Sequence, residues 1–436
     1  MCPQRPQPMA ASRPDISNPD GLSLIQAGKA PAWMTDRRTL AVIAALEAKG
    51  LAGCARFVGG CVRNTITGHP VVDVDIATTL TPDAVIEALT AAELRWVPTG
   101  VEHGTVTAII EGRPFEITTL RRDVSTDGRN ATVAFTLNWD EDAYRRDFRL
   151  NALYADPAGR LFDPTGEGLS DARAGRIVFV GEAMARVRED YLRILRFFRF
   201  QAWYGKGEAD ATAVAACQAL KDMLTGLAAE RIAKEVLKLL AAVDPRPSIS
   251  LMAQTGVLAT VLPELTTLDR FERLVANEVD QRIEPDAELR LAAVLSDGAA
   301  KAIAERLRLS NAQKARLIAA EGKSPRIDSR MSGPEARRAV YGLGQGTFTD
   351  RVKLGWAADS PAAAPQWRAL LALGETWAPP TMPITGVDVT AAGVPPGPRV
   401  GAILRQVESW WIDQDFTSDR DQAQERLKVV LKGMIA

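Results

Sequence analysis

The sequence predicts an α+β protein, in which a head with a small mixed sheet precedes an all-helical body. Up to about residue 180, short strand-like runs alternate with helical patterns. Beyond residue 182, apolar residues recur at helical spacing and strand-like alternation nearly disappears. The 436 residues are enough for several domains with a sizeable core. The hydrophobic share of 46% and the charged share of 25% are ordinary for a globular protein.

The head begins with a helix and then alternates strands and helices. In chain order, the expected elements are an amphipathic helix near 35–50, a strand and turn at 55–60, an acidic strand at 71–77, a helix from Thr81 to about 94, a β-hairpin over 104–121 and a mobile loop over 123–140. Thr81 suits a helix N-cap and Pro82 suits the first helical position. The turn of the hairpin is expected at 111–114, where a glycine and a proline interrupt the alternation.

The body shows helical periodicity along most of its length. Helices are expected at 182–203, 209–223, 228–242, 247–258, 268–278, 286–309 and 311–321. A Pro/Gly-rich stretch at 379–398 separates off a final helical segment, 399–434. These changes in pattern divide the chain into a disordered tail (1–33), a head (34–181), a helical neck (182–265) and a helical body and tail (266–436).

The composition indicates the cellular compartment of the protein and excludes some classes of binding partner. The net charge of −1 disfavours a protein coated in nucleic acid but allows a local basic groove. The N-terminal residues lack an apolar segment typical of a signal peptide, and no apolar run is long enough to span a bilayer. No C-x-x-C pattern occurs and only two histidines are present, which disfavours a zinc site. We therefore expect a cytoplasmic protein with free thiols that contacts no membrane and no DNA.

A glycine pair followed by two spaced acidic residues is the most informative pattern in the head. Gly59 and Gly60 end a short apolar run, and Asp73 and Asp75 lie in an alternating acidic strand, so their side chains are expected on one face. A glycine turn lets backbone N–H groups approach a ligand, and Mg²⁺ binds carboxylates together with substrate phosphates. The alternative is a surface strand with two solvated aspartates. The upstream glycine pair favours a metal–triphosphate site.

Two further segments carry candidate site residues in the head. Glu116 lies on the second strand of the predicted hairpin, where an antiparallel neighbour of the acidic strand would bring a third carboxylate into reach. Its alternative is an exposed strand glutamate. Arg146 and Asp147 follow another arginine, and guanidinium groups suit phosphate oxygens because they present parallel N–H donors. The alternative for this segment is a capped helix with a solvated basic face.

An acidic–basic pair near the start of the neck suggests recognition of a base. On one helix, Asp190 and Arg193 would lie three residues apart on one face. A carboxylate acceptor beside guanidinium donors matches an exocyclic amine next to a ring nitrogen, which cytosine and adenine both present. Uracil and guanine would leave polar groups unpaired, at a cost of several kcal/mol. The alternative is an ordinary helix salt bridge of a few tenths of a kcal/mol.

These motifs, in this order, resemble class II tRNA nucleotidyltransferases, the CCA-adding enzymes, and the related bacterial poly(A) polymerases. The resemblance covers roughly 55–265. The matching positions are Gly59, Gly60, Val62, Arg63, Asp73, Asp75, Ala77 and Thr78 in the first motif, Glu116 in the second, Arg146, Asp147 and Asn151 in the third, and Asp190, Arg193 and Arg196 in the fourth. The signature usually has Asp where this chain has Asn64, which keeps hydrogen bonding but loses the charge.

The resemblance implies transfer of CMP and AMP from CTP and ATP to the 3′ end of tRNA, with release of pyrophosphate. It implies that Asp73 and Asp75 hold two Mg²⁺ ions and that Glu116 assists them. Gly59, Gly60 and Arg63 would join the arginine motif around the triphosphate and ribose, and the Asp190 motif would select the base. The stretch at Glu230 resembles the helix that closes the core of the family, where a structural role is at least as good an interpretation.

Three other interpretations remain open at this stage. A poly(A) polymerase of the same family would extend RNA with ATP alone. A non-catalytic RNA-binding relic is disfavoured by the intact acidic and arginine motifs, and a nucleotide-signalling hydrolase is disfavoured by the presence of only two histidines. In the C-terminal third, a basic run could meet RNA phosphates or be a solvated surface. It consists of Lys314, Arg316, Lys323, Arg326, Arg330, Arg337 and Arg338.

Overall fold

The structure is a computed structural model that describes residues 23–25, 29–126, 131–265 and 267–433. The chain divides into two compact units, with the division between Pro263 and Glu264. The finer division into tail, head, neck and body stays a prediction. Most of the predicted tail lies outside the described residues, but part of it is ordered, because Leu24 is buried and its N–H donates to the Gly159 carbonyl over 2.8 Å.

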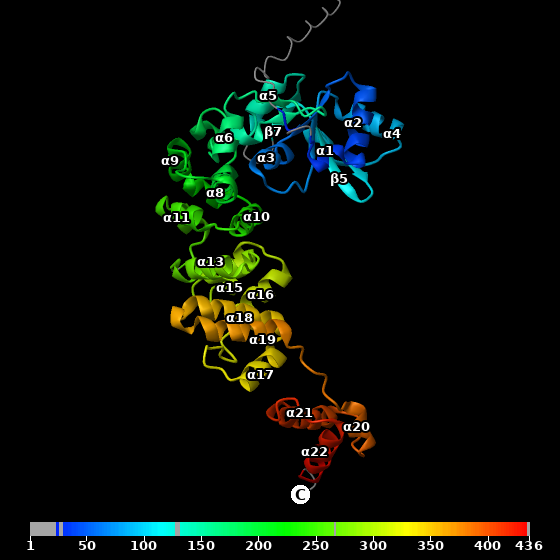
Figure 1. The fold of residues 1–436 in the computed structure, drawn as a ribbon, viewed down its shortest axis with the longest axis vertical. Coiled ribbons are helices and arrows are strands. Elements are labelled where there is room, and N and C mark those ends of the chain that lie inside the picture. Colours follow the sequence, from blue (N-terminus) through cyan, green and yellow to red (C-terminus); the bar gives the residue numbers. More distant parts are fainter. Residues whose placement is uncertain (1–22, 26–28, 127–130, 266, 434–436) are drawn as a thin grey trace, which may run out of the picture. The chain divides into compact units, whose positions relative to one another are not determined.

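A seven-stranded mixed sheet forms the centre of the head, in the blue-to-green part of Figure 1. Its strands are β1 Ala55–Val58, β2 Asp75–Thr78, β3 Arg95–Gly100, β4 Thr105–Ile110, β5 Arg113–Thr119, β8 Tyr154–Ala155 and β9 Leu161–Phe162. The strand order is β3-β4-β5-β2-β1-β8-β9. The pair β2·β5 is parallel and the other pairs are antiparallel. This arrangement confirms the mixed sheet that the sequence predicts.

Helices pack around this sheet. They are α1 Ala32–Thr35, α2 Arg37–Lys49, α3 Gly60–Thr67, α4 Pro82–Ala91 and the short turn η1 Val101–His103. Helices α2 and α4 lie where the sequence predicts them. Thr81 caps α4 by accepting the Ala84 N–H over 3.3 Å, and Pro82 occupies its first turn, as predicted. Helices α2 and α4 pack against each other, and the four residues of β1 are all buried. Because β1 is fully buried, it fixes the position of the turn that follows it.

The structure corrects the sequence prediction for a loop and for the acidic strand of the head. The segment predicted as a mobile loop over 123–140 contains a hairpin, β6 Arg121–Thr126 with β7 Ala131–Phe135, and the start of helix α5 Trp139–Tyr144. The segment as a whole is polar, but β7 contains threonine, valine and phenylalanine, which favour strands. The acidic strand is also shorter than predicted, because β2 begins at Asp75 and leaves Asp73 before it.

The rest of the first unit is mainly helical. Its elements are η2 Arg149–Asn151, α6 Gly168–Ala174, α7 Ala183–Glu189, α8 Leu192–Tyr204, α9 Ala211–Ala219, η3 Lys221–Gly226, α10 Ala229–Leu240, α11 Arg246–Gln254 and α12 Val257–Val261. The single helix predicted over 182–203 is wrong. Asp190 has extended backbone angles (φ −152°, ψ 107°) and separates α7 from α8. Helix α8 packs against both α10 and α11.

The second unit is helical throughout its described elements. These are α13 Asp269–Gln281, α14 Ala287–Val294, α15 Ala300–Arg306, α16 Asn311–Glu321, α17 Gly333–Leu343, α18 Gln345–Ala358, η4 Pro361–Ala363, α19 Ala364–Thr376, α20 Gly386–Ala391, α21 Pro398–Asp413 and α22 Arg420–Gly433. The helix predicted over 286–309 is in fact α14 and α15, separated by a turn in which Gly298 has φ +84°.

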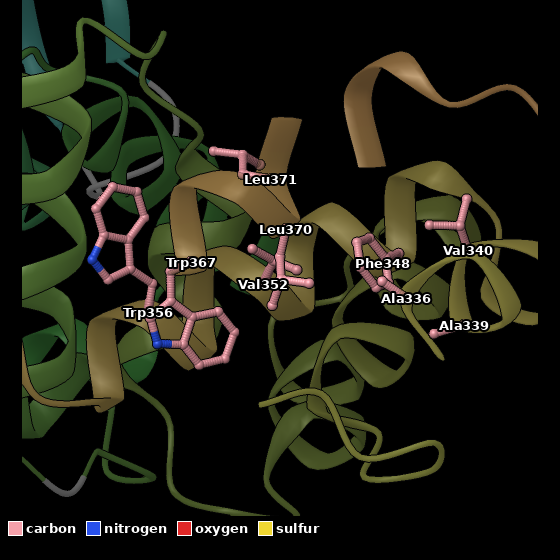
Figure 2. Packing of buried hydrophobic residues seen from close by; sticks show 9 residues of the cluster. All are labelled: Ala336, Ala339, Val340, Phe348, Val352, Trp356, Trp367, Leu370 and Leu371. Atoms are coloured by element: carbon pink, nitrogen blue, oxygen red, sulfur yellow. The ribbon is translucent and has the colours of Figure 1, made fainter. Parts of the chain in front are cut away.

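One apolar cluster joins three helices of the second unit (Figure 2). The cluster contains Phe348 and Trp356 of α18 and Trp367 of α19, together with alanine and valine side chains of α17. The Trp367 indole N–H also donates to Asp359 over 2.9 Å, so the ring is buried with its polar atom satisfied. None of the helices formed by the described residues is long and apolar enough to cross a membrane.

Candidate active site

The glycine turn lies where β1 meets α3. Gly59 has φ +66°, a conformation that disfavours any residue with a Cβ atom. A Cβ atom at Gly59 would lie 3.6 Å from Arg146 Nη1 and 3.8 Å from the Asn151 carbonyl oxygen. The first turn of α3, which begins at Gly60, leaves backbone N–H groups without partners inside the helix. At this turn an anion could approach the backbone closely and accept hydrogen bonds from its N–H groups.

Carboxylates gather beside this turn at the start of β2. Asp75 is the register partner of Glu116 on β5, and Asp73 precedes β2 as an exposed residue. The pairing is parallel, so the predicted antiparallel neighbour is wrong, although Glu116 does lie beside the acidic strand. Burial and the negative charges of Glu116 and Asp73 raise the pKa of Asp75 to about 6, although Arg146 and Arg63 act in the opposite direction. A bound cation would relieve this repulsion.

The acidic group fits a divalent cation that shares its coordination with a substrate. Among the described residues, no group of three or more His, Cys, Asp and Glu side chains is arranged to hold a metal ion unaided. Mg²⁺ often keeps waters and binds one or two carboxylates together with substrate phosphates. Asp75 supplies a carboxylate whose negative charge is poorly compensated in the protein alone, and Asp73 and Glu116 lie within its electrostatic reach.

The two adjacent arginines of the third motif are anchored by one buried carboxylate. Asp142, with 1% of its surface exposed, accepts hydrogen bonds from Arg145 Nε over 2.8 Å and Arg146 Nη2 over 2.9 Å. The Tyr154 hydroxyl donates to the same carboxylate over 2.7 Å. Burial alone would raise the pKa of Asp142, but Arg146 and Arg145 hold it well below its usual range. This anchor directs Arg146 toward Gly59.

A second buried carboxylate connects the arginine motif to the neck. Asp147 accepts hydrogen bonds over 2.9 Å from both the Phe148 N–H and Asn151 Nδ2, and over 2.8 Å from Arg196 Nε. Asn151 Oδ1 in turn accepts a hydrogen bond from Arg63 Nη1. Burial would raise the pKa of Asp147, but Arg196 and the hydrogen bonds hold it well below its usual range. Four predicted site residues thus form one continuous network across three elements.

We expect Asp147→Asn to lower the free energy of unfolding by about 2 kcal/mol, because it leaves Arg196 facing a neutral amide. The sign of the pH dependence follows from the depressed pKa. The Asp147 carboxylate stabilises the fold above its usual pKa of 3.8, and this contribution is lost as the pH falls below that value. Urea unfolding at pH 7 and at about pH 2.5, which is below the usual pKa of the group, measures both effects, with exposed Asp222→Asn as the control. Equal stability of Asp147→Asn and the control at pH 7 would contradict the network.

Asp190 and Arg193 lie near the junction of α7 and α8, but each has its own partner. Asp190 Oδ2 pairs with Arg231 Nη2 of α10 over 2.7 Å, and Oδ1 accepts the Leu192 N–H over 3.0 Å. Arg193 Nη1 pairs with Glu189 and also donates to the Arg186 carbonyl over 2.9 Å. The predicted placement on one helix face is therefore wrong, because Asp190 precedes α8. The alternative of a mutual salt bridge is wrong as well.

Comparison with known proteins identifies the family. Residues 55–178 match the family model described as Poly A polymerase head domain, and 210–268 match the probable RNA and SrmB-binding site of polymerase A. A relative from Mus musculus, named CCA tRNA nucleotidyltransferase 1, mitochondrial, is 31% identical over 387 residues, covering 86% of each chain. The chain belongs to the CCA tRNA nucleotidyltransferase family. The CCA-adding enzyme of Levilactobacillus brevis is 32% identical and covers 81% of this chain and 88% of its own.

Solved structures of the same family share the fold. The Bacillus stearothermophilus CCA-adding enzyme, solved in complex with CTP, superposes with a TM-score of 0.72 and 25% identity. The superposition covers 91% of this chain and 97% of that one. The Thermotoga maritima CCA-adding enzyme, solved with tRNA, has a TM-score of 0.64 at 20% identity and supports the fold alone. The nucleotidyltransferase head followed by helices is therefore the architecture of this family.

Two residues that shape the site were missed in the sequence analysis. Asp142 organises both arginines of the third motif, yet it lies in α5, just after the stretch 123–140 that the sequence predicts as a loop. Its spacing of three and four residues from Arg145 and Arg146 was the available signal, because residues so spaced meet on a helix. Tyr204, whose hydroxyl lies 2.9 Å from Arg63 Nη2, gave no local signal, since 141 residues separate the pair.

The basic run of the second unit is compensated by carboxylates. Each of its seven side chains lies in an ion pair: Lys314 with Glu305, Arg316 with Asp286, Glu288 and Asp350, Lys323 with Asp297, Arg326 and Arg330 with Asp328, Arg337 with Asp415, and Arg338 with Asp413. Most of these pairs are at least partly exposed, so RNA phosphates would have to compete with carboxylates for them.

Proposed function

We propose that the protein adds CMP and AMP from CTP and ATP to the 3′ end of tRNA without a nucleic-acid template and releases pyrophosphate. The observation that carries this proposal is the convergence of three groups in one unit. The glycine turn before α3 lies beside Arg146, the carboxylate of Asp75 lies beside Glu116, and Arg196 of α8 is bound to Asp147. Family membership supports the same reaction, because the similar relatives are named CCA tRNA nucleotidyltransferase and CCA-adding enzyme.

Asp73 and Asp75 are the residues that we propose to hold Mg²⁺, with Glu116 as an additional ligand or a neighbour of the ligands. When bound, Mg²⁺ lowers the pKa of the attacking 3′-hydroxyl and neutralises charge on the triphosphate, and two ions would divide these tasks. The raised pKa of Asp75 supports this assignment, because a carboxylate that is costly to ionise in the protein alone gains most from a cation. Metal dependence is general in this family, whereas Mg²⁺ and the number of ions are our proposal.

The triphosphate would lie against the glycine turn. The N–H groups at the start of α3, from Gly60 onward, and the guanidinium of Arg146 would donate to phosphate oxygens. Asn151 and Asp147, held together over 2.9 Å, would orient the ribose through their remaining hydrogen-bonding capacity. These groups are positioned before substrate arrives, so little reorganisation is needed at the moment of reaction.

Asp190 and Arg193 are the residues that we propose to read the base. Both side chains are anchored by neighbours, Asp190 by Arg231 and Arg193 by Glu189, and this anchoring limits their freedom to pair with a wrong base. A carboxylate acceptor and a guanidinium donor suit cytosine and adenine and leave uracil and guanine with unmatched polar groups. The alternative function, a poly(A) polymerase, is favoured only by the descriptions of the two matching family models.

We also propose that the enzyme acts in the cytoplasm. The described cysteines Cys54, Cys61 and Cys217 are free and buried, as expected where thiols stay reduced. The mouse relative is named as mitochondrial, and cell fractionation with an antibody to this chain distinguishes the two locations.

Incubation of the purified protein with Mg²⁺, CTP, ATP and tRNA lacking its last three nucleotides tests the proposed reaction. We expect a shift of three nucleotides in tRNA length with stoichiometric release of pyrophosphate. The reaction should stop when EDTA is added and resume with excess Mg²⁺. Absence of incorporation into any RNA would overturn the proposal, and extension with ATP alone would favour the poly(A) alternative.

A further inference from the structure

The arginines around the site fall into two electrostatic classes. Six of them have carboxylate partners: Arg145 and Arg146 with Asp142, Arg193 with Glu189, Arg196 with Asp147 and Glu235, Arg199 with Glu235, and Arg231 with Asp190. Arg63 differs, because within the described part of the chain no carboxylate lies at ion-pair distance from its guanidinium. Its positive charge is therefore the least compensated of the group.

All direct partners of the Arg63 guanidinium are neutral. Nε and Nη2 donate to Asn64 Oδ1 over 3.1 and 2.8 Å, and Nη1 donates to Asn151 Oδ1. The Tyr204 ring centroid lies 4.3 Å and the Phe200 ring centroid 5.1 Å from the guanidinium carbon. Only 8% of Arg63 is exposed, so solvent screens its charge weakly. Burial lowers the pKa of Arg63, but a guanidinium stays protonated at neutral pH.

Asn64 is the residue that keeps this charge uncompensated. Its side-chain oxygen accepts two of the Arg63 N–H groups, and its Nδ2 donates to the Pro70 carbonyl over 2.7 Å. An aspartate here would place a full negative charge about 3 Å from the guanidinium and would have no donor for Pro70. The amide therefore satisfies the hydrogen bonds of Arg63 without neutralising it.

The field of Arg63 acts on the region where the triphosphate is proposed to lie. A Cβ atom at Gly60 would lie 3.9 Å from Arg63 Nη2, which places the guanidinium directly beside the glycine turn. The same charge opposes the rise in the pKa of Asp75, so it also acts on the acidic group. A buried positive charge beside the N–H groups of a helix start favours a polyanion more than either feature alone.

We propose that Asn64 sets the affinity of the site for polyphosphate by leaving the Arg63 charge uncompensated. Asn64 is a positioning residue: it acts through Arg63 and does not touch the substrate. The chemistry recognised is the diphosphate or triphosphate group, independent of the base. This inference rests on the proposed function, because it places the NTP triphosphate at the glycine turn.

A pair of variants separates charge from hydrogen bonding. Asn64→Asp and Asn64→Leu both lose the donor to Pro70. The aspartate keeps the acceptor for Arg63 and adds a negative charge, whereas the leucine removes the acceptor and leaves the Arg63 charge uncompensated. We expect Asn64→Asp to weaken binding of inorganic pyrophosphate and of CTP about tenfold, or about 1.4 kcal/mol. We expect Asn64→Leu to change both dissociation constants less than twofold. Isothermal titration calorimetry without RNA measures both dissociation constants. If the Asn64→Leu protein does not fold, Asn64→Gln serves as the neutral variant.

The salt dependence of binding and the kinetic constants give readouts that a purely structural role would not move. The aspartate variant should show a weaker dependence of pyrophosphate affinity on NaCl, and a raised KM for CTP with a smaller change in kcat. Equal weakening by Asn64→Asp and the neutral variant, or wild-type affinity in Asn64→Asp, would overturn the proposal. These titrations do not need tRNA, so a wild-type protein that binds pyrophosphate but adds nothing to tRNA would contradict the proposed function and leave the charge comparison standing.

Discussion

Asp75→Asn is expected to reduce nucleotide incorporation at least about 10²-fold while making the protein more stable at neutral pH. The loss of activity follows from removal of a carboxylate proposed to hold Mg²⁺. The gain in stability follows from the raised pKa, because ionising Asp75 beside Glu116 and Asp73 is unfavourable in the fold. The stabilisation should be on the order of 1 kcal/mol. Single-turnover incorporation and urea unfolding, both at pH 7.5, measure the two effects.

The pH dependence of this stabilisation has a definite sign. In the folded protein the pKa of Asp75 is about 6, above its usual value of 3.8, so the folded state binds the proton more tightly than the unfolded state. The carboxylate therefore destabilises the fold most above pH 6, and this penalty disappears as the pH falls from about 6 to about 4. The advantage of Asp75→Asn should shrink over the same range. Asp83→Asn, an exposed change in α4, is the control and should alter neither activity nor stability. Near wild-type incorporation by Asp75→Asn would contradict the assignment of Asp75 as a metal ligand.

Asp190→Ala is expected to lower the preference for CTP and ATP over UTP and GTP by about 10²-fold. The change removes the proposed acceptor for the exocyclic amine of cytosine and adenine. It also removes the carboxylate that would repel the carbonyl of uracil or guanine. It also releases Arg231 and the Leu192 N–H, so some loss of stability should accompany it. Incorporation of each of the four nucleotides, measured separately as kcat/KM, gives the discrimination directly.

A matched control exists for the structural part of this change. Asp244 plays a comparable local role, since its carboxylate accepts the Arg246 N–H over 3.1 Å and pairs with the Arg246 guanidinium over 2.7 Å. Asp244→Ala should therefore cost stability without changing base preference. If Asp190→Ala keeps the selectivity of the wild-type protein, Asp190 serves only to join α8 to α10.

Features encoded by neighbouring residues could be predicted from the sequence. The helix start at Thr81-Pro82, the glycine turn and the hairpin around Gly112 depend on local backbone preferences, and the structure contains all three. The sequence also placed Glu116 beside the acidic strand, although the pairing of β2 with β5 is parallel. Strand direction depends on the chain path between the two strands, which local patterns do not determine.

Features that depend on distant partners could not be predicted in the same way. The break at Asp190 interrupts a stretch whose apolar spacing is helical throughout, and Arg231, 41 residues later, holds its carboxylate. The neutral surroundings of Arg63 likewise depend on Asn151 and Tyr204, 88 and 141 residues away. Pairs of polar residues that are distant in sequence leave no periodic pattern, so only the three-dimensional structure reveals them.

In the proposed reaction, the protein itself selects cytosine and then adenine. The most direct test offers tRNA lacking its 3′-terminal CCA to the wild-type protein with Mg²⁺ and all four nucleotides at equal concentration, followed by sequencing of the 3′ ends. We expect two C residues, then one A, and no further extension, and from tRNA ending in CC a single A. Long A tracts on either RNA, or substantial addition of U or G, would contradict selection of the base by Asp190 and Arg193.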